Sequence, residues 1–275
     1  MNNILTVAAK EIREGLRNRW VVATTLLLAA LALTLSFLGS APTGNVGVNQ
    51  LDIVIVSLSS LTIFLVPLIA LLLSHDAIVG EMERGTMLLL LSYPIGRKQV
   101  IVGKFLGHIA ILCFATVFGY GAAAVALMAT GTEIDAASWS SFLVMLGSSV
   151  LLGAVFIAIG YLASALVSER STAGGIAIGI WLLFVLIYDM ALLGGLVAAG
   201  GHALPAGLLD TLLLLNPTDV YRMLNLGSGG ASALSGMGGI AEFAGLNAMI
   251  LIAALAVWTL APLALAASVF SRREL

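Results

Sequence analysis

The stretch Leu51–Ser74, LDIVIVSLSSLTIFLVPLIALLLS, decides the fold class. Its hydrophobicity is continuous rather than alternating, its only charged residue is Asp52, and it is longer than the roughly 20 residues that a membrane-spanning helix needs. Every backbone polar group inside a bilayer must be satisfied internally, so only helices and closed barrels can cross, and a barrel strand would alternate. The stretch therefore predicts a spanning α-helix.

Five further stretches share this character. They are Trp20–Gly39, Gln99–Thr130, Trp139–Val167, Thr172–Ala199 and Leu246–Phe270. Charged residues make up 9% of the chain and hydrophobic residues 60%, whereas a soluble domain has roughly 25% charged residues. We expect a single all-α integral membrane domain over residues 1–275, with six transmembrane helices.

The basic residues set the expected orientation. Of the 12 lysines and arginines, 11 fall on one side of the predicted bundle, and the exception is Arg222. Since basic residues concentrate on the cytoplasmic side of membrane proteins, we expect both termini in the cytoplasm. A cleaved signal peptide is the alternative for the first stretch, because Gly39, Ser40 and Ala41 are small. The long preceding segment, which contains acids as well as bases, argues against cleavage.

Residues 1–19 carry too many charges to span, and they predict a cytoplasmic amphipathic helix. On a helical wheel one half is apolar and the other charged, with Val7 and Arg19 as exceptions. The apolar half contains Ile4, Leu5, Ala8, Ala9, Ile12, Leu16 and Trp20. The charged half contains Lys10, Glu11, Arg13, Glu14 and Arg17. We expect this helix to lie on the membrane surface, in contact with membrane lipid, and Lys10, Arg13 and Arg17 are its expected membrane-surface residues.

Residues 200–245 predict short periplasmic helices and a loop. Leu204–Leu215 is apolar but too short to cross a core of about 30 Å at 1.5 Å per residue, so we expect a re-entrant or interfacial helix there. A second short helix is expected over Thr218–Leu226, before a flexible run from Gly227 to Gly239. A seventh span would place the C-terminal arginine pair outside. The residues expected to face a periplasmic partner are Asp210, Asn216, Pro217, Asp219 and Arg222.

Residues 75–98 form the second predicted cytoplasmic connection. A short helix is expected up to Gly85, on which Glu81 and Arg84 are neighbours at i, i+3, and glycine suits its C-terminus. A second apolar turn, Thr86–Tyr93, stops at a proline. The basic residues that follow, where anionic headgroups or an acidic partner would meet them, are Arg97, Lys98 and Lys104. The alternative is a solvated loop.

The pattern in this connection resembles the signature of ABC-2 type permeases. It consists of Ile78-x-x-Glu81-x-Glu83-x-Gly85-Thr86, then Pro94-Ile95-x-Arg97, then Gly103-Lys104. The resemblance implies a coupling helix seated in a groove of a cytoplasmic ABC ATPase, with the N-terminal helix in the same interface. The coupling residues that it implies are Asp76, Ile78, Glu81, Glu83, Arg84, Gly85, Thr86 and Arg97.

Within that family, the segment HDAIVGEMERGT, residues 75–86, looks like the branch that serves maturation of nitrous oxide reductase. This likeness implies a homodimer in the bacterial inner membrane and a periplasmic β-helix protein as a further partner. It also implies a role in assembling the copper-sulfur centre of the reductase. An ABC-2 exporter of a lipid, a polysaccharide or a drug shares every motif and stays open as the alternative.

No energy-converting site is expected in the chain itself. A phosphate-binding loop needs G-x-x-x-x-G-K-[ST], and the only Gly-Lys pair, Gly103-Lys104, is followed by Phe105. ATP and Mg²⁺ are therefore expected on the partner ATPase. No catalytic residue is expected either, because an intramembrane protease would need convergent nucleophile, histidine or carboxylate groups within the membrane.

No metal site and no nucleic-acid partner are expected. His108 and Cys113 would point away from each other on one helix, while His75 and His202 fall on opposite sides of the membrane. The carboxylate nearest to mid-membrane is Asp189, which the residue count places at the outer interface. The absence of polar residues at mid-depth favours an apolar cargo or a conformational signal.

Small residues recur on the fourth and fifth predicted spans. Gly160 and Ser164 form a small-xxx-small pair, and Gly174, Gly175 and Gly179 open the fifth span. Such residues allow two helix backbones to approach closely. They fit either a dimer seam or packing within the monomer, and the sequence leaves both open.

Overall fold

The computed structural model describes residues 3–17, 19–38, 50–129, 135–198, 206–226 and 246–273. Over these ranges the regular structure is helical, with no strand, which confirms the all-α prediction. The segments long and apolar enough to cross a membrane are Leu51–Glu83, Arg97–Ala129, Ala136–Leu166, Arg170–Gly195 and Ala248–Arg272. A sixth crossing results if α2 (Arg19–Leu38) is counted with α1 (Asn3–Arg17). The predicted run Gly227–Gly239 and His202 lie outside the described residues.

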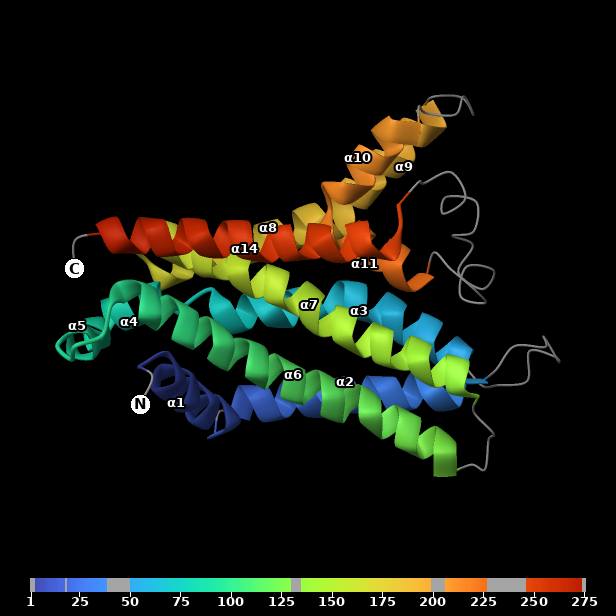
Figure 1. Cartoon of the computed structure of the whole chain (residues 1–275), viewed down its shortest axis with the longest axis horizontal. Coiled ribbons are helices and arrows are strands. Elements are labelled where there is room, and N and C mark those ends of the chain that lie inside the picture. Colours follow the sequence, from blue (N-terminus) through green and yellow to red (C-terminus); the bar gives the residue numbers. More distant parts are fainter. Residues whose placement is uncertain are drawn as a thin grey trace.

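Helix α1 and the last turn of α14 (Ala248–Arg272) lie at the same end of the bundle (Figure 1). The two short helices α4 (Val79–Glu83) and α5 (Thr86–Leu91) lie there as well. We call this the basic end, because all the lysines lie on its elements. The opposite end, where α3 (Gln50–Ser74) and α7 (Ala136–Leu166) begin, is the acidic end.

Helix α7 is the most enclosed span and packs against both α3 and α14. Glycines on α7 allow the close approach. A Cβ at Gly160 would lie 2.0 Å from Oγ of Ser74, and one at Gly153 would lie 2.0 Å from Cδ2 of Leu112. Because Gly160 and Ser164 are both buried against other helices of the same chain, this small-residue pair packs within the monomer.

Helix α1 lies directly against α6 (Arg97–Ala129) and makes an angle of 67° with α2. A Cβ at Gly103 would lie 2.7 Å from Cβ of Val7, and one at Gly107 would lie 2.5 Å from Cβ of Glu11. The two glycines stand one turn apart on α6, so the backbones of α1 and α6 meet along one line. Val7, which the helical wheel left outside the apolar half, is buried at this contact.

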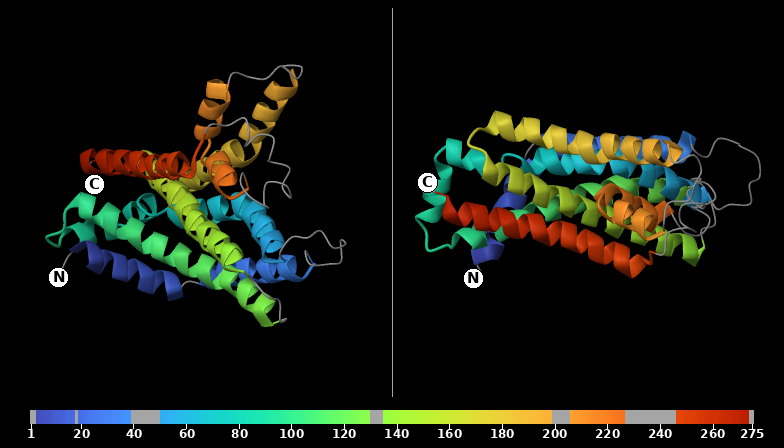
Figure 2. Two further views of the ribbon diagram at one scale, coloured as in Figure 1. Left: turned by 45° about the vertical axis from the view of Figure 1, so that its right-hand side comes forward. Right: turned by 90° about the horizontal axis from the view of Figure 1, so that it is seen from above.

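The segment Arg170–Gly195 is interrupted by a π-helical turn. Helix α8 (Arg170–Leu182) runs into the turn η1 (Leu183–Ile187) and then into α9 (Tyr188–Ala198). Beyond the turn, α9 leaves the bundle together with α10 (Ala206–Leu214), as Figures 1 and 2 show. The chain then re-enters as α11 (Pro217–Leu226), which packs against α3, α7 and α14.

Polar side chains do gather in the middle of the bundle, so the expectation of an apolar mid-depth is wrong. Oγ1 of Thr62 lies 2.7 Å from Oη of Tyr120, and Oγ of Ser149 lies 3.0 Å from Oη of Tyr221. All four side chains are buried. They come from α3, α6, α7 and α11 and look isolated in the sequence, but the bundle brings them together and their hydroxyls satisfy one another.

Candidate functional site

The connection between α3 and α5 is anchored to α7. The backbone N–H groups of Ile78 and Val79, at the start of α4, both donate to Oγ of Ser164 at 3.1 Å. Such amides have no partner within their own helix, so the serine satisfies them. Ile78 is itself fully buried. The connection is therefore part of the packed bundle, and the alternative of a solvated loop does not hold.

Gly85 forms the turn between α4 and α5. Its φ of 69° is left-handed, which is the only positive φ in the described part of the chain. Glycine adopts this conformation without the steric cost that a Cβ imposes. The N–H of Gly85 donates to the carbonyl of Met82, and the hydroxyl of Thr86 donates to the carbonyl of Glu81. The predicted helix end at Gly85 is confirmed.

Lys104 joins three helices at the basic end. Its Nζ, on α6, lies 2.8 Å from Oε1 of Glu11 on α1 and 2.8 Å from Oε1 of Glu81 on α4. The Lys104 side chain is only 3% exposed. Lys10 brings a second positive charge to within 3.4 Å of the Glu11 carboxylate and 3.6 Å of the Glu81 carboxylate. We call these four residues the Lys104 cluster; two cations balance two carboxylates, which burial of charge requires.

Glu11 and Lys10 keep their charges across the neutral pH range. Burial raises the pKa of Glu11, but the Lys104 ammonium more than offsets this, and the pKa of Glu11 is lowered below its ordinary 4.5. Burial lowers the pKa of Lys10, but Glu11 and Glu81 outweigh that effect and raise the pKa of Lys10 above 10.5. One acceptor is left over: Oε2 of Glu81 is buried without a hydrogen-bond partner among the described residues.

His108, one turn beyond Lys104 on α6, extends the network to α7. Its Nε2 lies 3.7 Å from Oε2 of Glu11, and its Nδ1 lies 2.9 Å from Oη of Tyr161. With the proton on Nε2 facing the carboxylate, Nδ1 is free to accept the tyrosine proton. The buried network thus spans α1, α4, α6 and α7.

Helix α5 and the turn that follows it carry an exposed apolar surface that sequence reasoning missed. Leu88 is 56% exposed, Leu89 68% and Tyr93 67%, whereas Met87 on the opposite side is 1% exposed. We call Leu88, Leu89 and Tyr93 the apolar tip. The signal was present in the sequence, because α5 is too short to bury a run of leucines on every side. Exposed large apolar groups that cluster mark an interaction site.

The predicted coupling residues divide between the surface and the interior. Glu83, Arg84 and Thr86 are exposed. Ile78 and Glu81 are buried, so they cannot contact a partner directly in this state. The predicted pairing of Glu81 with Arg84 is not formed, because Glu81 is bound to Lys104 instead. Glu11, predicted on the charged surface of α1, is buried for the same reason.

Asp76, Glu83 and Arg97 fasten the connection to neighbouring spans. Oδ2 of Asp76 lies 2.7 Å from Nη2 of Arg170, and Oε1 of Glu83 accepts the backbone N–H of Arg170 at 2.7 Å. Arg97 donates to the carbonyls of Phe270, Ser271 and Arg273 at the end of α14. The connection is therefore tied to α8 and α14 as well as to α7.

At the acidic end, α11 is fastened to the interrupted span. Arg222 on α11 pairs with Asp219 on the same helix and with Asp189 on α9, and we call these three the Arg222 cluster. Nδ2 of Asn216 donates to the carbonyl oxygen of Phe184 at 3.0 Å. Phe184 lies in η1, where the π-helical pattern alters the normal backbone pairing. These polar side chains therefore bind other parts of the same chain.

Burial does not fit the prediction that α11 faces a periplasmic partner. Asn216, Pro217 and Asp219 are buried, because α11 folds back among the spans rather than lying on them. Asp189, predicted as a hydrated boundary residue, is ion-paired. Asp210 on α10 is half-buried, and its Oδ1 has no partner among the described residues. Within the described ranges, no group of three or more histidine, cysteine or acidic side chains is arranged to hold a metal.

A bundle of apolar spans, with a buried charge cluster and an exposed apolar tip at one end, defines a multi-pass helical membrane protein. The chain belongs to the ABC-2 family of transporter proteins, whose family model, described as "ABC-2 family transporter protein", matches residues 5–275. This confirms the family resemblance found in the sequence.

Two curated relatives span the whole chain. One is the probable ABC transporter permease protein NosY of Pseudomonas aeruginosa, 49% identical over 273 residues and covering 99% of each chain. The other has the same name, comes from Stutzerimonas stutzeri, and is 47% identical over 277 aligned residues, again covering 99% of each chain. The chain is a membrane permease subunit of an ABC transporter, and an ABC ATPase is its partner.

Proposed function

We propose that the basic end is where ATP hydrolysis by a cytoplasmic ABC ATPase is converted into movement of the spans. In this proposal both termini are cytoplasmic, and ATP and Mg²⁺ are held by the ATPase. The observation that carries it is the Lys104 cluster, in which α6 is held to α1 and α4 by ion pairs of 2.8 Å. The exposed tip and Glu81 of the cluster belong to one connection, so a force on the tip reaches the cluster.

The apolar tip supplies the docking surface. Leu88 and Leu89 are exposed on α5, which is not part of a span. Burying one leucine side chain would stabilise a complex by about 1.5–3 kcal/mol. A groove on the ATPase that covers the tip would gain this energy. Arg84 and Thr86, exposed beside the tip, provide polar contacts at its edge.

Transmission follows from the anchors of the connection. A displacement of α4 acts through Glu81 on Lys104 and hence on α6 and α1. It acts through Ser164 on α7, and through Arg170 on α8. Because all of these contacts are buried or charge-assisted, the basic end moves as a unit rather than as a loop.

The proposed output is a conformational signal at the acidic end. The hydroxyl pairs at mid-depth are buried and bonded to one another, which supports transmission through the bundle rather than an open polar path within one chain. The partner surface that we propose is α10 with the residue that follows it, where Leu208 and Leu215 are exposed, in place of the buried α11. A periplasmic β-helix protein is the partner that the sequence resemblance implies.

We further propose that the transporter serves assembly of the copper-sulfur centre of nitrous oxide reductase. Support comes from the segment at residues 75–86 and from the full-length similarity to two relatives named NosY. The working unit proposed is a homodimer. Gly175 and Gly179 on α8 have open space where a Cβ would stand, which is what close approach of a second helix requires.

Coupling is tested with the permease and its ATPase co-purified in lipid nanodiscs. Lys104→Gln should retain bound ATPase but lose the ATP-dependent assembly of the reductase centre in cells. Leu88→Ser combined with Leu89→Ser should lose the ATPase itself. Lys98→Gln, an exposed lysine two turns before Lys104, is the matched control and should behave as the native chain. Native ATP-dependent function in a folded Lys104→Gln variant would overturn the proposal.

The homodimer is tested by disulfide cross-linking in a Cys113→Ser background, which removes the single cysteine. Gly179→Cys should form a cross-linked dimer in membranes, whereas Gly147→Cys on α7, whose surroundings are equally open, should not. Cross-linking at Gly147→Cys alone would move the dimer contact from α8 to α7.

A further inference from the structure

The outer surface of α1 is divided into three sectors. Ile4, Val7, Ala8, Glu11 and Gly15 lie on the face covered by α6. The second sector is apolar and largely uncovered, and it contains Leu5, Ala9, Ile12 and Leu16. The third is charged and contains Lys10, Arg13, Glu14 and Arg17. Since successive residues are 100° apart, Arg13 falls at the boundary between the apolar and charged sectors.

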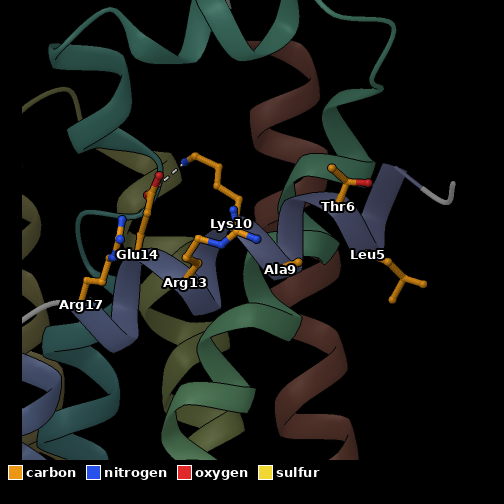
Figure 3. A pocket seen from close by; sticks show the side chains of 7 residues that line it. All are labelled: Leu5, Thr6, Ala9, Lys10, Arg13, Glu14 and Arg17. Atoms are coloured by element: carbon orange, nitrogen blue, oxygen red, sulfur yellow. Dashed lines mark ion pairs between the residues drawn. The ribbon is translucent and has the colours of Figure 1, made fainter.

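A groove of about 600 Å³ lies over that boundary (Figure 3). It is lined by Leu5, Thr6, Ala9, Lys10, Arg13, Glu14 and Arg17. Figure 3 shows the Leu5 side chain directed toward the side of α1 on which the spans run, and Lys10 directed to the opposite side. The groove thus combines an apolar wall on the side of the spans with basic side chains.

The charges in the groove are not balanced. Lys10 is bound to Glu14 at 3.2 Å and to the Lys104 cluster. Arg13 and Arg17 make no ion pair with any described residue, and both are exposed. They stand at i, i+4 on one face, about 5–6 Å apart at Cβ, so both guanidinium groups can reach one phosphate.

We propose that this groove binds an anionic phospholipid of the cytoplasmic leaflet. Arg13 and Arg17 hold the phosphate, and an acyl chain lies along Leu5, Ala9 and Leu16. Three observations favour a lipid over a soluble anion: the apolar wall, the 67° angle that lays α1 across the basic end, and the 63% exposure of Leu5 beside the charges. The inference does not depend on the assignment of the ATPase contact.

The test is native mass spectrometry of the full permease–ATPase complex in nonionic detergent, titrated with phosphatidylglycerol or phosphatidylcholine. Phosphatidylglycerol should bind more tightly. Arg13→Gln combined with Arg17→Gln should weaken its binding about thirtyfold, because each basic residue near an anionic surface contributes about a factor of five. Arg272→Gln removes an exposed charge from the same end outside the groove and should leave binding unchanged.

Several outcomes would overturn the proposal. A comparable loss in the Arg272→Gln control would mean that the attraction is unspecific. Competition by glycerol phosphate at the concentration of the lipid would assign the groove to a soluble phosphate. Lipid binding to the permease alone but not to the permease–ATPase complex would assign the groove to the protein interface. Leu5→Ser combined with Leu16→Ser gives a second check, since it should weaken lipid binding while leaving glycerol phosphate without effect.

Discussion

The ammonium of Lys104 lies 2.8 Å from the carboxylate of Glu11, a residue 93 positions earlier in the chain. The pair forms only when α1 lies on α6, so it reports that the N-terminal helix is docked. The same ammonium binds Glu81 from the connection that carries the apolar tip. The Lys104 ammonium thus contacts both α1 and α4, the two elements that the family resemblance places in the ATPase interface.

Replacing Lys104 should destabilise the basic end strongly. Lys104→Met leaves the buried carboxylates of Glu11 and Glu81 with Lys10 as their remaining lysine, and breaking a buried pair in this way costs about 3–5 kcal/mol. The midpoint of thermal unfolding in detergent should fall. Lys98→Met, on the exposed side of the same helix, is the control and should shift it little. An unchanged midpoint for Lys104→Met would show that the cluster does not hold the helices together.

The pH dependence of the cluster has a definite sign. The pKa of Glu11 is lowered in the folded protein, so its stabilising contribution is complete above its ordinary 4.5 and is lost as the pH falls through the lowered value. The pKa of Lys10 is raised, so its contribution is complete below 10.5 and is lost only above that. The difference in unfolding midpoint between the native chain and Glu11→Gln should therefore be constant from about pH 5 to 9, because Glu11 and Lys10 both remain charged over this range. A difference that shrinks near pH 7 would contradict this assignment.

Substitutions on the two sides of α5 should affect different properties, stability on the buried side and ATPase binding on the exposed side. Met87→Ala removes a buried side chain and should cost about 2–5 kcal/mol, whereas Leu89→Ala removes an exposed one and should change stability by no more than about 0.5 kcal/mol. Association with the ATPase, measured by titration in detergent, should weaken about tenfold for Leu89→Ala, as for an interface hot spot. A Leu89→Ala variant that binds the ATPase normally would remove the apolar tip from the interface.

Gly85→Ala should strain the turn between α4 and α5. A residue with a Cβ pays about 1–2 kcal/mol in the left-handed conformation that Gly85 occupies. The space around the glycine is open, so the cost is conformational and not steric. Gly96→Ala is the control, because its φ is not left-handed and the nearest atoms to its Cβ are 3.9 Å away. Equal midpoints for the two variants in thermal unfolding would show that the turn relaxes.

Removing Arg222 should loosen the acidic end. Arg222→Met leaves Asp189 and Asp219 without their cation and should cost about 3–5 kcal/mol locally. Hydrogen exchange of α11 should become faster. Adding Asp219→Asn removes one of the stranded charges and should restore part of the protection. Arg84→Met, which removes an exposed arginine at the other end, should leave exchange in α11 unchanged.

Hydropathy was sufficient to predict the spans, because each is a continuous apolar run. It was also sufficient to predict that α10 and α11 do not cross the membrane, because both helices are too short. The Gly85 turn followed from the one residue that has no Cβ. These features depend on local sequence, which is why they could be predicted.

The side-chain partners could not be predicted in the same way. Glu11 sits on the charged half of an isolated wheel, and only the position of Lys104 on α6 turns it inward. Val7 was outside the apolar half, yet it is buried because Gly103 lies opposite. The polar residues at and before the start of α11 were predicted to face a partner. Asn216 instead donates to the carbonyl oxygen of Phe184 in the π-helical turn, and no sequence pattern indicates that turn.

The glycine contact between α1 and α6 also restricts how this permease can vary. Gly103 and Gly107 flank Lys104, and even a methyl group at either position would overlap Val7 or Glu11. A substitution at one of these glycines is therefore tolerable only if α1 loses bulk at the facing position. Among homologues, positions 7 and 103 should change together, as should positions 11 and 107, while the lysine between the glycines stays fixed. The sequence of the N-terminal helix α1 would then vary together with that of α6, although the two helices are far apart in the chain.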